Sequence, residues 1–124
     1  MSTMNEANIS GVPQLVAHQG PLIVLAGKKY VLPPMTLKIR RLDSESRRAM
    51  ASGYDELKEQ DLLVQVITLT LQRNYPDLKL SELEDEVEYL ELLEAYATLK
   101  EQEQLLLADM GKRVAAAAMG QGGR

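Results

Sequence analysis

The chain has 124 residues, 45% of them hydrophobic, and a net charge of −4 at pH 7, which favours one domain with a core of its own. It contains no Cys, which excludes disulfides and thiolate metal sites. No apolar run approaches the roughly 20 residues that span a bilayer, and residues 1–10 lack the order of a signal peptide. We therefore expect a soluble, cytoplasmic protein.

The hydrophobic residues and the charges are both unevenly distributed. Phe and Trp are absent, so the core must rest mainly on Leu, Val, Ile, Met and Ala, and Leu and Met favour helices. Residues 1–50 have a net charge of +4, residues 51–110 of −11 and residues 111–124 of +3. This division can steer a partner or pair the two halves with each other.

The N-terminal part predicts an arm followed by a hairpin. Residues 1–20 are polar and show no sustained period, which is typical of a flexible arm. Two short β-rich runs, 22–25 and 29–32, flank a turn at Gly27, and Gly supplies the positive φ that a tight hairpin needs. Pro33 ends the second run because it has no N–H for a ladder.

Two helices are expected next. Thr36 is a suitable N-cap for a strongly basic helix over about 37–50. Asp55 is a suitable N-cap for a helix over about 55–74, which ends where the residue before Pro76 disfavours helix. Apolar residues recur in this second helix at three- and four-residue spacing, so we expect it to be the most buried element.

A third helical region is predicted over 81–110, where Ser81 and Glu84 have the spacing of a capping box. It forms either one helix or two, with a break near Glu86. We expect Gly111 to end it and residues 111–124 to form a flexible tail. The predicted fold is mainly α: residues 21–110 form a small helical domain with an N-terminal β-hairpin.

Catalytic patterns are nearly absent, so we expect no enzyme activity, no cofactor and no metal site. His18 is the only imidazole and lies in the predicted arm, where we expect it to be solvated. The Gly27-Lys28 pair lacks the first Gly and the Ser/Thr of a phosphate-binding loop. The acidic residues of 82–94 lack the central Gly of a calcium loop. They form either a solvated helix face or a docking face for a basic partner, or for the basic helix of this chain.

One broad apolar stripe stands out in the third helical region. It contains Tyr89, Leu92, Tyr96, Leu99, Leu106 and Met110, with Glu103 as its only charged member. Such a stripe is either core or an interface for a partner or a second copy, and both interpretations stay open. Five residues of the stripe and two residues of the hairpin form the predicted partner-binding set. The set is Tyr30, Leu32, Tyr89, Leu92, Tyr96, Leu99 and Leu106.

Two segments resemble the tail assembly chaperones of long-tailed bacteriophages. The segment LAGKKYVLPPMTL, residues 25–37, is similar to that family's hairpin entering a helix. The segment QRNYPDLKLSELE, residues 72–84, is similar to its helix end and capped restart. The resemblance covers about residues 22–90. Two departures are the high charge of the basic helix and the lack of Pro or Asn just after residue 84.

The resemblance implies a role in tail morphogenesis. Such a chaperone binds the tape measure protein, helps recruit tail tube protein around it, acts in the host cell cytoplasm and is absent from the mature virion. The family often makes a longer, frameshifted form, which here would share residues 1–112. That form and a second copy of the chain are further expected partners.

Two other functions remain open. The basic helix 37–50 suggests a nucleic-acid-binding or regulatory protein, because phosphate contacts require clustered Lys and Arg. Nucleic acid ranks lower as a partner, since the chain is acidic overall and no aromatic residues alternate with the basic ones. A structural virion component, such as a head-tail connector, is the other alternative.

Overall fold

The computed structural model describes residues 16–122, with side chains up to residue 117. Within this range two strands are followed by four helices. The strands are β1 (Leu22–Leu25) and β2 (Lys28–Val31). The helices are α2 (Leu37–Met50), α3 (Glu56–Leu71), α4 (Leu80–Glu86) and α5 (Tyr89–Gly122). The predicted mainly α fold with an N-terminal hairpin is confirmed.

The hairpin closes with a two-residue turn. Ala26 and Gly27 both have positive φ, 53° and 77°, as a type I′ turn requires. Leu25 therefore pairs directly with Lys28, and β2 begins one residue earlier than predicted. Along β1, Ile23 and Leu25 face the core while Leu22 and Val24 are exposed, which follows the two-residue period of a strand.

Side-chain caps start α2 and α3 at the predicted positions. The Thr36 hydroxyl accepts a hydrogen bond from the Ile39 N–H at 3.2 Å. The Asp55 carboxylate accepts from the N–H groups of Leu57 and Lys58. α3 ends at Leu71, before the predicted end at residue 74, because the N–H groups of Arg73 and Asn74 make tighter bonds to carbonyls three residues earlier.

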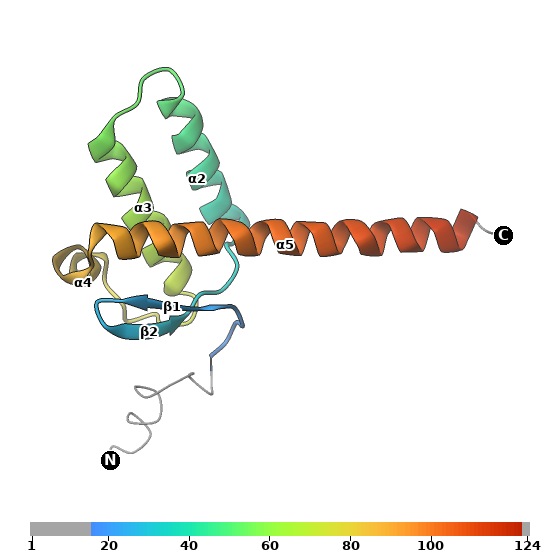
Figure 1. Ribbon diagram of the computed structural model, residues 1–124, viewed down its shortest axis with the longest axis horizontal. Coiled ribbons are helices and arrows are strands. Elements are labelled where there is room, and N and C mark those ends of the chain that lie inside the picture. Colours follow the sequence, from blue (N-terminus) through green and yellow to red (C-terminus); the bar gives the residue numbers. More distant parts are fainter. Residues whose placement is uncertain (1–15, 123–124) are drawn as a thin grey trace, which may run out of the picture.

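The core lies where α3 and α5 meet each other and the hairpin. α3 contacts α2, α4 and α5, and α5 also contacts β1. Figure 1 shows α5 crossing the molecule, with the hairpin on one side and the α2–α3 pair on the other. α3 supplies the largest group of buried side chains. They are Leu62, Leu63, Val64, Val66, Ile67, Thr68, Thr70 and Leu71.

The third helical region is two helices. α4 ends at Glu86, and Val87 is extended, with φ −84° and ψ 139°. The predicted Ser81–Glu84 capping box is wrong, because α4 starts at Leu80. The Lys79 N–H instead donates to the Glu82 carboxylate at 3.1 Å. The acid that caps the start of the helix is therefore Glu82 and not the predicted Glu84.

Gly111 does not end α5, contrary to the sequence-based expectation. The helix continues through it to Gly122, so residues 111–122 are helical. A glycine inside a helix costs only about 1 kcal/mol relative to alanine, and the leucines before Gly111 and the alanines after it favour helix. Residues 123–124 lie outside the described residues.

Of the predicted arm, the structure describes residues 16–20, and residues 1–15 lie outside it. The His18 N–H donates to the Asn74 carboxamide oxygen at 2.8 Å, and the Asn74 amide donates back to the His18 carbonyl at 2.7 Å. His18 is therefore half-buried against the end of α3, whereas the sequence suggested a solvated side chain. Among residues 16–122, no helix combines the length and the apolar character required to cross a membrane.

Candidate partner-binding surface

α5 is packed against the domain along its first part and uncovered along its second. Leu92, Ala95 and Leu99 are buried. From Gln104 to Ala117 every described side chain is exposed, and Figure 1 shows this part of α5 projecting away from the other elements. We call residues 104–122 the α5 extension.

The face of α5 that enters the core continues along the extension. Met110 follows Leu92 by 18 positions, and Val114 follows Tyr96 by 18, which is about five full helical turns in each case. Both pairs therefore share one side of the helix. The apolar face of the extension consists of Leu106, Leu107, Met110 and Val114, which are 46%, 50%, 58% and 65% exposed.

An ion-pair network from α2 holds α5 just before the extension begins. The Asp43 carboxylate, only 1% exposed, accepts from the Tyr96 hydroxyl at 2.7 Å and from the Lys100 ammonium at 3.1 Å. Arg40 Nε lies 2.6 Å from Glu103 Oε2. Burial raises the pKa of the Tyr96 hydroxyl, and its hydrogen bond to Asp43 raises it further. The direction of the extension is therefore set by these contacts.

The segment that follows the hairpin also contacts α5. The Gln102 amide donates to the Leu32 carbonyl at 3.0 Å. Gly20 packs so closely that an added Cβ would lie 1.8 Å from the Leu32 oxygen, so only glycine fits there. A small groove of about 130 Å³ opens at this junction, and Pro34, Met35 and Leu107 are among its lining residues. The apolar face of the extension is thus continuous with this groove.

The seven residues predicted to bind a partner fall into three environments. Leu32, Leu92 and Leu99 are buried in the core. Tyr30 and Tyr96 are partly buried, Tyr30 with its ring edge-on to Tyr75 at 5.1 Å. Tyr89 and Leu106 are exposed, but they lie 17 positions apart, about 25 Å along the helix. The structure therefore does not bring the seven together into one surface.

Sequence reasoning missed several residues of the uncovered surface. Leu107 and Val114 were not included, and Met110 was placed in the stripe but not in the binding set. The signal was the four-residue spacing of Leu106, Met110 and Val114, which runs past Gly111. Asp43 was also missed. It lies four residues after the buried Ile39 and so faces the same way.

The basic helix α2 is partly neutralised within the chain. Arg47 Nη1 lies 2.7 Å from Glu59 Oε2, and Arg40 pairs with Glu103. Glu103, the one charged member of the apolar stripe, therefore serves as a partner for α2. Lys38, Arg41 and Arg48 are exposed and form no ion pair with any residue that the structure describes.

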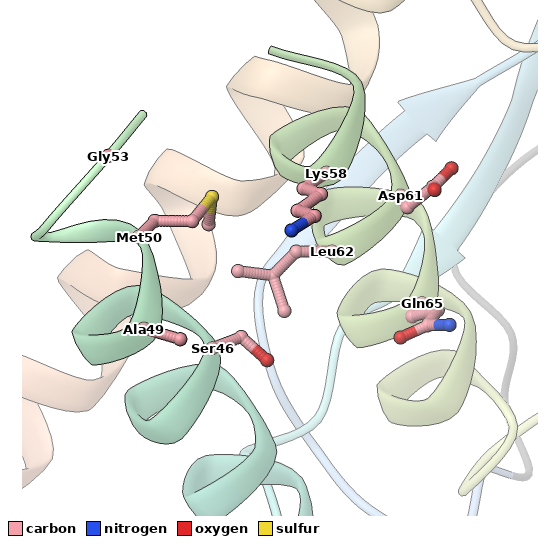
Figure 2. A pocket seen from close by; sticks show the side chains of 8 residues that line it. All are labelled: Ser46, Ala49, Met50, Gly53, Lys58, Asp61, Leu62 and Gln65. Carbon is pink, nitrogen blue, oxygen red and sulfur yellow. The ribbon is translucent and has the colours of Figure 1, made fainter. Parts of the chain in front are cut away.

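A pocket of about 250 Å³ lies between the end of α2 and α3. Figure 2 shows Leu62 and Met50 at its centre, the Lys58 amine beside them, and the Asp61 carboxylate turned away from the space between the helices. The volume is below the usual range for ligand sites, and none of the eight lining residues is His or Cys. Across residues 16–122, no three His, Cys, Asp or Glu residues are grouped so as to hold a metal ion.

The fold and its uncovered surface define a class: a small helical protein in which one long helix projects from a packed domain and exposes an apolar face. No protein-family model, curated protein or solved structure matches the chain. The α5 extension is therefore the feature of the structure from which a function can be proposed.

Proposed function

We propose that this protein is a tail assembly chaperone that binds a helical segment of the phage tape measure protein along the α5 extension. The observation that carries the proposal is the uncovered apolar face of Leu106, Leu107, Met110 and Val114. Its three- and four-residue spacing suits packing against another amphipathic helix. The contacts of Tyr96, Lys100 and Glu103 to α2 fix the orientation of α5 just before this face begins.

The expected contribution of this face to binding is substantial. Each of its four side chains is about half exposed, so covering one contributes roughly 1 kcal/mol. Ordering of both partners offsets part of that gain. A long partner with many apolar helical segments can bind several copies, and each copy then covers surface that would otherwise cause aggregation. Recruitment of tail tube protein and departure before the virion matures belong to the same proposal.

Co-expression with the cognate tape measure protein tests this function. We expect the chain to keep the tape measure protein soluble and to co-purify with it. Met110→Asp should abolish co-purification, because it places a charge in the middle of the apolar face. Leu105→Asp is the matched control, since Leu105 is similarly exposed on the same helix but points to the other side. Equal capture by both variants would overturn the proposal.

The same preparation separates the other two functions. A structural virion component would be found by mass spectrometry in purified particles, whereas a chaperone would be absent from them. A nucleic-acid-binding protein would lose affinity with Lys38→Glu and Arg41→Glu, which alter exposed cations of α2. The chaperone proposal predicts that these two substitutions leave capture of the tape measure protein unchanged.

A further inference from the structure

A groove of about 300 Å³ lies at the end of the domain opposite the α5 extension. Its apolar lining comes from α3, the α4–α5 link and the start of α5, and its acidic rim comes from α3 and α4. The lining residues are Gln60, Asp61, Val64, Glu84, Val87, Tyr89 and Leu92. Asp61 contributes here because its carboxylate points away from the pocket between α2 and α3 (Figure 2). An apolar floor with two carboxylates on the rim favours an apolar segment that carries positive charge.

The charge around the groove strengthens that preference. Residues 80–94 contain seven acidic and no basic residues. Glu84, Asp85, Glu86 and Glu88 are exposed, so their combined field extends beyond the groove and attracts a basic partner.

The α5 extension has the complementary character. Its apolar face is exposed, and the extension also carries the basic residues Lys112 and Arg113. Residues 111–124 contain three basic and no acidic residues. Arg113 is paired with Asp109 at 2.8 Å, but both side chains are more than half exposed. Such an exposed pair contributes little stability, so Arg113 can exchange Asp109 for a carboxylate of the groove at little cost.

The extension cannot occupy the groove of its own chain. Leu92 lines the groove and Met110 lies 18 positions further along the same helix, which is about 27 Å. Figure 1 shows α4 and the projecting end of α5 at opposite ends of the molecule. An α5 extension that occupies the groove must therefore come from another copy.

We propose that the α5 extension of one copy docks in the acidic groove of a second copy, head to tail. Each copy then offers one extension and one groove, so the contact is heterologous and generates open chains or closed rings. The pairing uses the same apolar face as the proposed binding of the tape measure protein. A bound tape measure segment therefore competes with self-association, and only this competition rests on the proposed function.

Sedimentation velocity and light scattering on the purified chain test the pairing. We expect the wild-type mass to rise with protein concentration at low salt and to fall as salt screens the charges. Met110→Asp, which alters the extension, and the double variant Asp61→Lys/Glu84→Lys, which alters the groove, should each be monomeric. An equimolar mixture of the two should form a 1:1 heterodimer and nothing larger, because only one competent extension and one competent groove remain.

Charge exchange provides a second measurement. Adding Arg113→Glu to the groove double variant should restore concentration-dependent association, since the charges are reversed on both sides. Circular dichroism melts show whether each variant is folded. A wild-type chain that stays monomeric throughout would overturn the proposal. So would folded variants that stay associated, or a mixture of the two monomers that fails to pair.

The outcomes also separate this inference from the proposed function. The groove double variant should lose self-association and still capture the tape measure protein, whereas Met110→Asp should lose both. Loss of capture in the groove variant would overturn the assignment of the groove to a second copy. Capture by the wild type without any self-association would leave the proposed function standing alone.

Discussion

The Tyr96 hydroxyl donates a 2.7 Å hydrogen bond to the Asp43 carboxylate, although the two residues are 53 positions apart. Asp43 lies on the basic helix α2 and is only 1% exposed. Lys100 also donates to this carboxylate, at 3.1 Å. A buried carboxylate requires such partners, because an unpaired one would be strongly destabilising. This one acid therefore joins the basic α2 to the base of the α5 extension.

Replacing Tyr96 by Phe should destabilise the fold. The substitution removes a hydrogen bond to a carboxylate and keeps the ring, so we expect a loss of about 1.5–3 kcal/mol in the free energy of unfolding. Urea denaturation measures it. Tyr89→Phe is the control, since Tyr89 is exposed, and its effect should be close to zero. Equal effects in the two variants would show that the Asp43 contact contributes nothing.

Truncation of the α3 core should be costly. Leu63 and Ile67 are 1% and 0% exposed, so Leu63→Ala or Ile67→Ala should each cost about 2–5 kcal/mol through lost burial and the cavity left behind. Leu57→Ala, at an exposed position of the same helix, should cost less than about 0.5 kcal/mol. Thermal melts compare the three. Similar melting temperatures would contradict the packing of α3.

The hairpin turn contains a strained alanine whose replacement should stabilise the protein. Ala26 has φ 53°, a conformation that costs a residue with a Cβ about 1–2 kcal/mol. Asn tolerates it well and is preferred before Gly in type I′ turns, so Ala26→Asn should recover part of that cost and raise the free energy of unfolding by up to about 1 kcal/mol. Ala49→Asn, at an exposed helical position, should lower it. A decrease for Ala26→Asn would refute the turn geometry.

Acid should weaken the contact between Glu59 and its two partners. Hydrogen bonds from Tyr54 and then from Arg47 lower the pKa of Glu59 below its ordinary value of 4.5. A lowered folded-state pKa stabilises the fold above about pH 4.5. That contribution is lost as the pH falls through the folded value. Glu59→Gln should therefore reduce the difference in stability between pH 6 and pH 3. An unchanged difference would argue against these bonds.

The opposite dependence is expected in alkali. The bond to Glu59 raises the pKa of Tyr54 to about 12 from an ordinary value of 10.0. A raised folded-state pKa stabilises the fold below pH 10, and the contribution is lost as the pH rises towards 12. A titration of tyrosinate absorbance should show one fewer late-titrating Tyr in Tyr54→Phe than in the wild type.

The elements that carry local signals were predicted well. Thr36, Asp55 and Gly27 act through neighbours within a few residues, so a cap or a turn can be recognised without the rest of the fold. The break at Val87 has no such signal, because neither Gly nor Pro is present there. It coincides with one long-range contact, in which the Glu91 carboxylate accepts from the Ala26 N–H, and with the burial of Leu83. The same carboxylate also accepts from the Glu88 N–H three residues away.

The candidate surface was harder to predict for a related reason. A helical apolar stripe shows which residues share a face, but not what covers them. Leu92 and Leu99 are covered by elements distant in sequence, whereas Met110 and Val114 on the same face are not. Along this face, a residue belongs to the core if another element reaches it and to the surface if none does. How far the other elements reach along α5 depends on their lengths, which the pattern of α5 does not contain.

The continuity of α5 makes its projecting half a lever arm. The helix contacts α2 through Tyr96, Lys100 and Glu103 and is uninterrupted from Tyr89 to Gly122. A small rotation of α5 at these contacts would therefore produce a larger displacement at the C-terminal end of the helix. About 18 residues beyond the pivot correspond to about 27 Å, and a tilt of about 10° would displace the tip by about 5 Å. Repacking of α2 against α5 would therefore displace the extension far enough to break its contacts with a bound partner.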